Sequence, residues 1–133
     1  MTETELVSAY YAAFNRGDWD GMCGLLADHV VHDLNQGARE IGRAKFRAFL
    51  ERMNRSYREE LRDIVVMAGP KGRASAEYVV DGAYLETDEG LPPATGQRYT
   101  LPGGAFFEIS NGAITRVTNY YNLQDWLRQV GAS

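Results

Sequence analysis

Apolar residues in the N-terminal part of the chain repeat at helical spacing in three segments. The first opens with Thr2 and Glu5, the spacing of a capping box, and ends at Gly17, which tolerates the left-handed conformation at a helix C-terminus. Asp18 can cap a short second helix, and a longer amphipathic segment follows Gly42. The apolar stripes are Leu6, Val7, Tyr10, Tyr11 and Phe14 within residues 2–16; Trp19, Met22, Leu25 and Leu26; and Phe46, Phe49, Leu50, Met53 and Tyr57.

Other segments alternate between apolar and polar residues with the period of two that is typical of strands. The last two are joined by Asn111 and Gly112, a strong signal for a hairpin turn. Residues 90–96 contain two consecutive prolines, so we expect a loop there. The predicted strands cover residues 29–35, 61–68, 73–87, 98–110 and 113–122.

The order of these elements is helix, helix, strand, helix and then strands only, closed by a short helix over residues 123–130. Such segregation is typical of α+β proteins, in which helices cover one face of an antiparallel sheet. We therefore predict a cone-shaped, curved antiparallel sheet wrapped around three N-terminal helices, with a short C-terminal helix. A length of 133 residues fits one domain over residues 1–133.

Composition and charge narrow the classes of function. The chain is 44% hydrophobic and 24% charged, and its net charge of −4 argues against nucleic-acid binding. No apolar run is long enough for a membrane span, and the acidic first residues do not resemble a signal peptide, so we expect a cytoplasmic protein. With Cys23 alone and two histidines, the sequence predicts neither a disulfide nor a metal site of the Cys/His type.

Asp33 is the strongest candidate for chemistry. By strand alternation it shares a face with Val31 and Asn35, so it points into the interior if Val31 does. Loss of hydration there would raise the pKa of its carboxyl group toward a value useful for a general base. The alternative is a carboxylate at a strand end that caps backbone amides in the turn at Asn35-Gln36-Gly37. The spacing alone favours neither hypothesis.

Tyr10 is the candidate hydrogen-bond donor, because a neutral phenol beside a carboxylate base suits the stabilisation of an enolate oxyanion. Asn119 shares a strand phase with Val117 and Tyr121, and its amide could orient a polar ligand group. His32 has the opposite phase to Asp33 and is expected outside the cavity. The candidate substrate-binding residues are Phe14, Val31, Asn35, Phe49, Tyr78, Tyr84, Phe107, Asn119 and Tyr121.

The segment Ala9-Tyr10-Tyr11-Ala12-Ala13-Phe14-Asn15-Arg16-Gly17-Asp18-Trp19-Asp20-Gly21 resembles the opening of bacterial ketosteroid isomerase. Residues 27–42, with Val31-His32-Asp33, resemble the segment that carries the isomerase's base. The resemblance implies Tyr10 as the oxyanion-hole tyrosine, Asp33 as the general base and Phe49 as a pocket aromatic. These roles are those of that isomerase, in which the surroundings of the acidic groups shift their pKa values.

Two departures from the isomerase bear on function. Its protonated aspartic acid corresponds here to Ala105, or to Gly104 if the register slips, and neither side chain can donate. The loop around Pro92-Pro93 resembles SnoaL-type polyketide cyclases, although Asn122 stands where those often carry aspartate. Over nearly its whole length the chain is similar to ketosteroid isomerase-related proteins of the nuclear-transport-factor-2-like (NTF2-like) superfamily. Their fold hosts isomerases, cyclases, dehydratases, epoxide hydrolases and binding modules.

Two functions remain open at this point. The first is a cofactor-independent isomerase, cyclase or dehydratase that acts on a small apolar carbonyl compound, with Asp33 as base and Tyr10 as donor. The second is a non-catalytic ligand-binding or dimerisation module of the same fold. In either case we expect a homodimer that pairs through the outer face of the sheet, where Arg116, Thr118 and Tyr120 lie on one strand phase.

Overall fold

The computed structural model describes residues 1–131 and contains the three N-terminal helices that the periodicity predicts. They are α1 (Glu3–Asn15), α2 (Trp19–Cys23) and α3 (Arg43–Ser56). The capping box forms as expected, with Thr2 and Glu5 bonded to each other's backbone amides. Gly17 has φ +71°, and the Asp18 side chain accepts a hydrogen bond from the amide of Gly21 at 2.8 Å. Local sequence signals therefore fix where α1 ends and where α2 begins.

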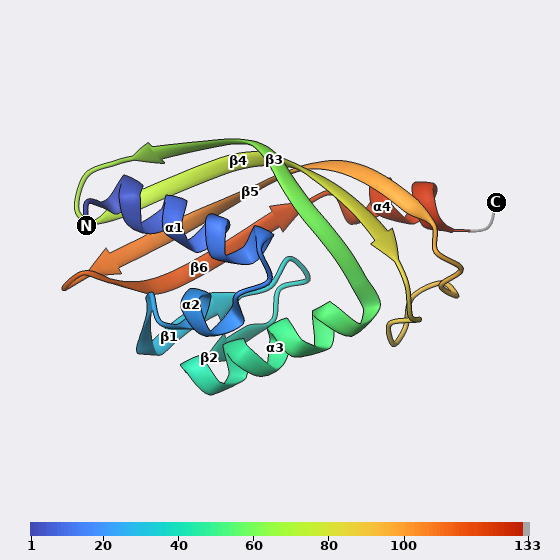
Figure 1. Cartoon of the computed structure of the whole chain (residues 1–133), viewed down its shortest axis with the longest axis horizontal. Helices are drawn as coiled ribbons and strands as arrows, with labels where there is room; N and C mark the ends of the chain where they lie inside the picture. Colours follow the sequence, from blue (N-terminus) through green and yellow to red (C-terminus); the bar gives the residue numbers. More distant parts are fainter. Residues whose placement is uncertain (132–133) are drawn as a thin grey trace.

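A single curved sheet of six strands, in the order β2-β1-β6-β5-β4-β3, wraps around these helices (Figure 1). The short helix α4 (Leu123–Val130) packs against β5. This architecture confirms the predicted α+β fold. The strands are β1 (Leu26–Asp33), β2 (Arg39–Ile41), β3 (Tyr57–Ala68), β4 (Arg73–Tyr84), β5 (Arg98–Ser110) and β6 (Ala113–Tyr121).

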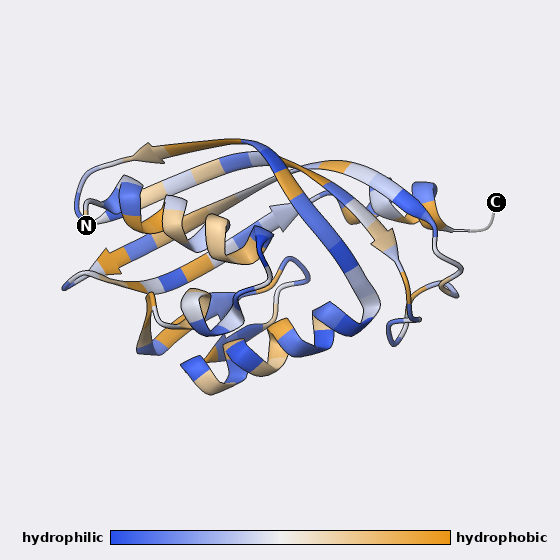
Figure 2. Cartoon of the chain, viewed as in Figure 1, coloured by the Kyte–Doolittle hydropathy of each residue, from blue (hydrophilic) through white to orange (hydrophobic). Residues whose placement is uncertain are grey.

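The two faces of the sheet have different surroundings. The inner face packs against α1 at β3 and β4 and against α3 at β1, whereas none of the helices within residues 1–131 lies over the outer face (Figure 1). Apolar and polar residues alternate along the long strands (Figure 2). On β4 and β5 the buried positions repeat every second residue, as the sequence pattern predicts.

The predicted sheet was wrong in one respect, because β1 and β6 pair in parallel. The Asn111-Gly112 hairpin forms, with φ of +52° and +75°, and it fixes the direction of β6 relative to β5. The other edge of β1 pairs antiparallel with β2, a strand that the sequence had suggested was only a turn. β6 therefore meets the remaining edge of β1 after a long crossover, which allows parallel pairing.

The position at which β3 begins also differs from the prediction. Tyr57 was placed on the apolar stripe of α3, but α3 ends at Ser56 and Tyr57 already pairs with Tyr84 of β4. Asn15, at the end of α1, fixes this edge strand with two hydrogen bonds of 2.9 Å to the backbone N–H and C=O of Leu61. The earlier start of β3 adds Tyr57 and Glu59 to the strand residues whose side chains share a face with the buried Leu61.

Candidate functional site

The side chains of β1 that face the core are the opposite set to the one predicted. Val30 is fully buried and His32 is 2% exposed, whereas Val31 and Asp33 lie on the outer face. The His32 ring packs against Phe46 and Phe49 of α3, with centroid distances of 4.4 and 4.7 Å. The adjacent valines Val30 and Val31 are equally apolar, so alternation could not decide which of them faces the core. The expectations that Asp33 and Val31 point inward and that His32 points outward are therefore wrong.

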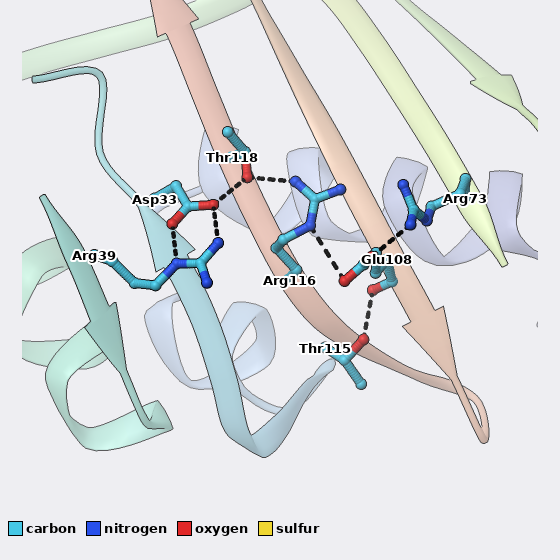
Figure 3. A network of polar contacts seen from close by, with 7 residues as sticks. All are labelled: Asp33, Arg39, Arg73, Glu108, Thr115, Arg116 and Thr118. Atoms are coloured by element: carbon cyan, nitrogen blue, oxygen red, sulfur yellow. Dashed lines mark hydrogen bonds and ion pairs between the residues drawn. The ribbon is translucent and has the colours of Figure 1, made fainter. Parts of the chain in front are cut away.

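Asp33 is held by two neighbouring strands (Figure 3). Arg39, its cross-strand partner on β2, donates from Nε and Nη2 to the two carboxylate oxygens at 2.6 and 3.1 Å. Thr118, its partner on β6, donates its hydroxyl to Asp33 at 2.7 Å. These contacts lower the pKa of Asp33 from 3.8 to about 2, mainly through the Arg39 hydrogen bonds. Instead of a raised pKa, the structure gives an ionised, structurally engaged carboxylate.

The Asp33 contacts continue across the outer face as a network of alternating charge (Figure 3). Arg116 contacts the Thr118 hydroxyl and pairs with Glu108 at 3.2 Å. Arg73 pairs with the same glutamate at 2.8 Å. The network links β2, β1, β6, β5 and β4 on the face opposite the helices. It satisfies each charge without a ligand, so it gives no sign of a reactive carboxylate.

His32 and Asn119 form a polar pair on the inner face. Asn119 Nδ2 lies 3.2 Å from His32 Nε2, which confirms that the Asn119 amide faces inward. Burial lowers the pKa of His32 to about 4, although the nearby Asp33 charge opposes this, so the ring is neutral at pH 7. Because an amide NH₂ can only donate, Nε2 is the acceptor and the ring proton lies on Nδ1. Within residues 1–131, Nδ1 has no hydrogen-bond partner.

Tyr10 is part of an aromatic core and is not beside Asp33. It is 4% exposed and makes edge contacts with Tyr11, Phe46 and Phe107, at centroid distances of 5.1, 6.4 and 5.5 Å. Burial raises the pKa of its phenol, which therefore stays protonated. Asp33 lies on the other face of the sheet, so the expected pairing of Tyr10 and Asp33 in one cavity is wrong.

Three other predicted pocket residues have structural contacts. Tyr84 is fully buried, donates to the carbonyl of Pro92 at 2.7 Å and accepts from the amide of Asp88, which anchors the proline loop. Asn35 accepts from the amide of Tyr121 at 2.9 Å. Phe14 packs on Trp19 between α1 and α2, with centroids 5.8 Å apart. These contacts bring Asn35 beside one other candidate, Tyr121, whereas the contacts of Phe14 and Tyr84 are with residues outside the candidate set.

Tyr78, Asn119 and Tyr121 belong to the inner face, where a second carboxyl group also lies. Glu59 of β3 accepts a hydrogen bond from the Tyr99 hydroxyl at 2.6 Å. Burial raises the pKa of Glu59, and the Tyr99 hydrogen bond partly opposes this shift. Sequence reasoning missed this pair because the predicted strand began at Leu61. Alternation of Tyr57, Glu59 and Leu61 was the signal that would have placed Glu59 inward.

Ala105 occupies the inner-face position that corresponds to the isomerase's acid. It is 1% exposed and pairs with Asn119 of β6 and Ala76 of β4. Gly104 pairs with the outward-facing Tyr120. The structure therefore selects Ala105 of the two registers that the sequence left open, and its methyl group can donate no hydrogen bond.

Comparison with known proteins settles the family. A family model described as a SnoaL-like domain matches residues 7–117. The chain belongs to the SnoaL-like domain family. A search of curated proteins finds no match for this SnoaL-like chain.

Solved structures agree with this assignment. One from Xanthomonas campestris pv. campestris has 68% sequence identity and a TM-score of 0.93, covering 97% of this chain and 96% of that one. Another, from Pseudomonas putida KT2440, has 61% identity and a TM-score of 0.97, covering 98% and 99%. Each bears the name "putative polyketide cyclase". An NTF2-like protein from Burkholderia xenovorans LB400, at 14% identity, covers 97% and 95% with a TM-score of 0.77 and shows the same fold alone.

Across residues 1–131, His, Cys, Asp and Glu side chains form no group of three or more that could hold a metal ion. No helix in that range is long and apolar enough to cross a membrane.

The Asp33 contacts predict how stability depends on pH. The depressed pKa means that Asp33 contributes stability above its unfolded-state pKa and loses it as the pH falls from about 4 to about 2. Because Arg39 is largely exposed, Asp33→Asn should lower the free energy of unfolding at pH 7 by about 1 kcal/mol or less. Urea denaturation at pH 7 and pH 2 measures this difference, which should be much smaller at the lower pH, where about half of Asp33 is protonated in the folded state.

The matched control is Asp28→Asn, which removes a fully solvent-facing carboxylate paired with Arg43 at 2.9 Å. That substitution should change stability less than Asp33→Asn does. A gain in stability at pH 7 for Asp33→Asn would contradict the outward, ion-paired placement of this carboxylate.

Proposed function

We propose that this SnoaL-like domain binds a small, largely apolar carbonyl compound on the inner face of its sheet and converts it without a cofactor by isomerase- or cyclase-type chemistry. The observation that carries the proposal is the His32–Asn119 pair. A neutral imidazole with one ring nitrogen engaged leaves a second, buried donor without a partner in the described chain. Leaving such a group unpaired costs about 1–3 kcal/mol, which the carbonyl oxygen of a ligand would offset.

The surroundings of this pair suit an apolar ligand with one polar group. Phe46 and Phe49 flank the imidazole, and Asn119 pairs across the strands with Ala105, whose side chain is small and apolar. The names of the two close relatives support cyclase-type chemistry on carbonyl-rich compounds. Small-molecule sites typically have apolar walls with a small number of polar groups set in them.

A non-catalytic ligand-binding or dimerisation module is the second candidate function. It is favoured by the contacts of Asp33, whose carboxylate is fully used by Arg39 and Thr118. It is also favoured by the aromatic packing around Tyr10, which fills the space that an isomerase-like pocket would need. Asp33 as base and Tyr10 as donor therefore have no support from the geometry, and catalysis by this domain needs a different carboxyl group.

Binding of 2-naphthol, an aromatic enol of this size class, tests the first proposal. We expect saturable binding by calorimetry to the wild-type protein. Asn119→Leu should weaken 2-naphthol binding about 10-fold, because the free energy that about one hydrogen bond contributes to orienting the ligand is lost. Asn54→Leu, at an exposed position on α3, is the control and should bind like wild type. Equal affinity of Asn119→Leu and wild type would count against the inner-face site.

Activity on steroids should be weak or undetectable. Losing one of two oxyanion donors typically costs on the order of 10²–10³ in rate, and Ala105 supplies no replacement. The conjugated enone absorbance formed from a 3-keto-Δ5-steroid reports the reaction. Ala105→Asp could raise residual activity if the apolar surroundings keep the new acid protonated. Wild-type turnover near that of a dedicated isomerase would show that the missing acid is not needed.

We also propose that two copies of the chain pair through the outer face of the sheet. Large apolar side chains are exposed there together, and Phe106 and Tyr120 form an edge contact at 5.9 Å. The adjacent network carries both signs of charge, which allows a two-fold copy to match it. An exposed apolar patch of this kind marks an interaction surface. Its members are Val65, Met67, Phe106 and Tyr120, which are 46–56% exposed.

Light scattering at micromolar concentration should therefore give the mass of a dimer. Phe106→Glu should shift the population toward monomer, because it places a charge inside the buried apolar contact. Leu85→Glu, at an exposed position just after the end of β4, should leave the dimer intact. A wild-type monomer under these conditions would contradict the proposal.

A further inference from the structure

We propose that Glu59 is the proton-transfer residue of the inner-face site and that Tyr99 positions it. This inference rests on the proposed function, since it assigns the carboxyl group that an isomerase- or cyclase-type reaction on this face requires. Asp33 cannot take that role from the outer face. Glu59 is the inner-face carboxyl group that the fold supplies in its place.

The position of Glu59 is set by three adjacent strands. Glu59 of β3 pairs with Gly82 of β4, and Gly82 pairs with Tyr99 of β5. The Tyr99 ring crosses over Gly82, where a Cβ atom would lie 2.3 Å from the ring. The missing side chain at Gly82 thus lets the Tyr99 hydroxyl reach across a whole strand to Glu59, at 2.6 Å. This hydrogen bond engages the Oε2 atom of Glu59, and within residues 1–131 no side chain donates a hydrogen bond to the other carboxyl oxygen.

The charge around Glu59 differs from that around Asp33. No Lys, Arg or His within residues 1–131 forms an ion pair with Glu59. Its titratable neighbours are phenols on three strands, namely Tyr78 on β4, Tyr99 on β5 and Tyr121 on β6. Burial and then the Glu59 charge raise the pKa of Tyr78 to about 12. A base surrounded by neutral donors is the arrangement that enolate chemistry needs.

A small molecule can reach Glu59 from the edge of the sheet. β3 is the last strand in the sheet order, and Asn15 of α1 occupies part of its edge. A pocket of about 520 Å³ at this end reaches Glu59, Tyr99 and Asn15, and the larger part of its lining is on the outer face: Arg58, Glu60, Asp81, Ala83, Arg98 and Thr100. This volume lies within the usual range for ligand pockets.

The proposed step is an isomerisation in which Glu59 moves a proton from one carbon of the substrate to another. The free oxygen of the Glu59 carboxylate takes a proton from a carbon next to the substrate carbonyl. The electron pair of that C–H bond becomes the C=C bond of an enolate, whose oxygen keeps the hydrogen bond that His32 Nδ1 donates to the substrate carbonyl in the proposed site. Glu59 then returns the proton to another carbon of the same conjugated system, so no oxidant, reductant or co-reactant is consumed.

Exchange of α-protons of 2-tetralone for deuterium, followed by proton NMR in D₂O, measures this step directly. The wild-type protein should accelerate exchange above the buffer rate, and Glu59→Gln should reduce the acceleration at least about 100-fold. The amide of Glu59→Gln keeps an acceptor for Tyr99, so the fold should persist in circular dichroism. Glu86→Gln, at an exposed position just after β4 and outside this pocket, and Asp33→Asn should both exchange like wild type.

Tyr99→Phe tests the positioning role separately. The Tyr99 hydrogen bond favours the ionised form of Glu59, so its removal should raise the pKa of Glu59 and move the low-pH limb of the exchange profile to higher pH. A residue that only filled space would leave the profile in place. An unchanged pH profile in Tyr99→Phe would therefore overturn the role assigned to Tyr99.

Binding of 2-naphthol, which shares the ring skeleton of 2-tetralone, separates the two levels of the proposal. If 2-naphthol binds and wild type shows no accelerated exchange, or Glu59→Gln exchanges as fast as wild type, the Glu59 assignment is wrong and the binding function stands. If 2-naphthol does not bind, the proposed function fails, and the Glu59 assignment fails with it.

Discussion

The packing of β1 against α3 is the constraint on which the arrangement of carboxyl groups depends. Val30 and His32 are buried there, and a shift of one residue would exchange them for Val31 and Asp33. Burial of one aliphatic side chain is worth about 1.5–3 kcal/mol, and an aspartate moved inward would lose its partners Arg39 and Thr118. Packing and electrostatics therefore favour the same phase, with Asp33 outside.

This phase divides two carboxyl groups between two faces and gives them opposite properties. Asp33 is ionised within a network that ties β1 to β2 and β6, so its role is to hold the edge of the sheet together. Glu59 lies among phenols without a cationic partner in the described chain, and burial raises its pKa. Differences of environment between two carboxyl groups assign their roles in this way in other enzymes. Under our proposal, the reactive carboxyl group of this fold lies on β3 and not on β1.

The sequence predicted the fold well because its signals were local. The capping box at Thr2, the glycine at position 17 and the Asn111-Gly112 turn each specify backbone geometry by themselves. The site was predicted less well, since it depends on which face of a strand is buried. The adjacent valines Val30 and Val31 did not indicate which face of β1 is buried. The resemblance to an isomerase then favoured Asp33 as the base. Glu59 escaped notice because the end of α3 and the start of β3 were placed too late, and its partner Tyr99 lies two strands away in the sheet.

The pKa values of the two carboxyl groups test this account most directly. Carboxyl carbon shifts of ¹³C-labelled Asp and Glu, assigned with Asp33→Asn and Glu59→Gln and followed from pH 1.5 to 8 in steps of about half a unit, would give both values in one titration. The account predicts that Asp33 stays ionised down to about pH 2 and that Glu59 titrates above the ordinary glutamate value. The reverse order, with Asp33 raised and Glu59 ordinary or lowered, would contradict it.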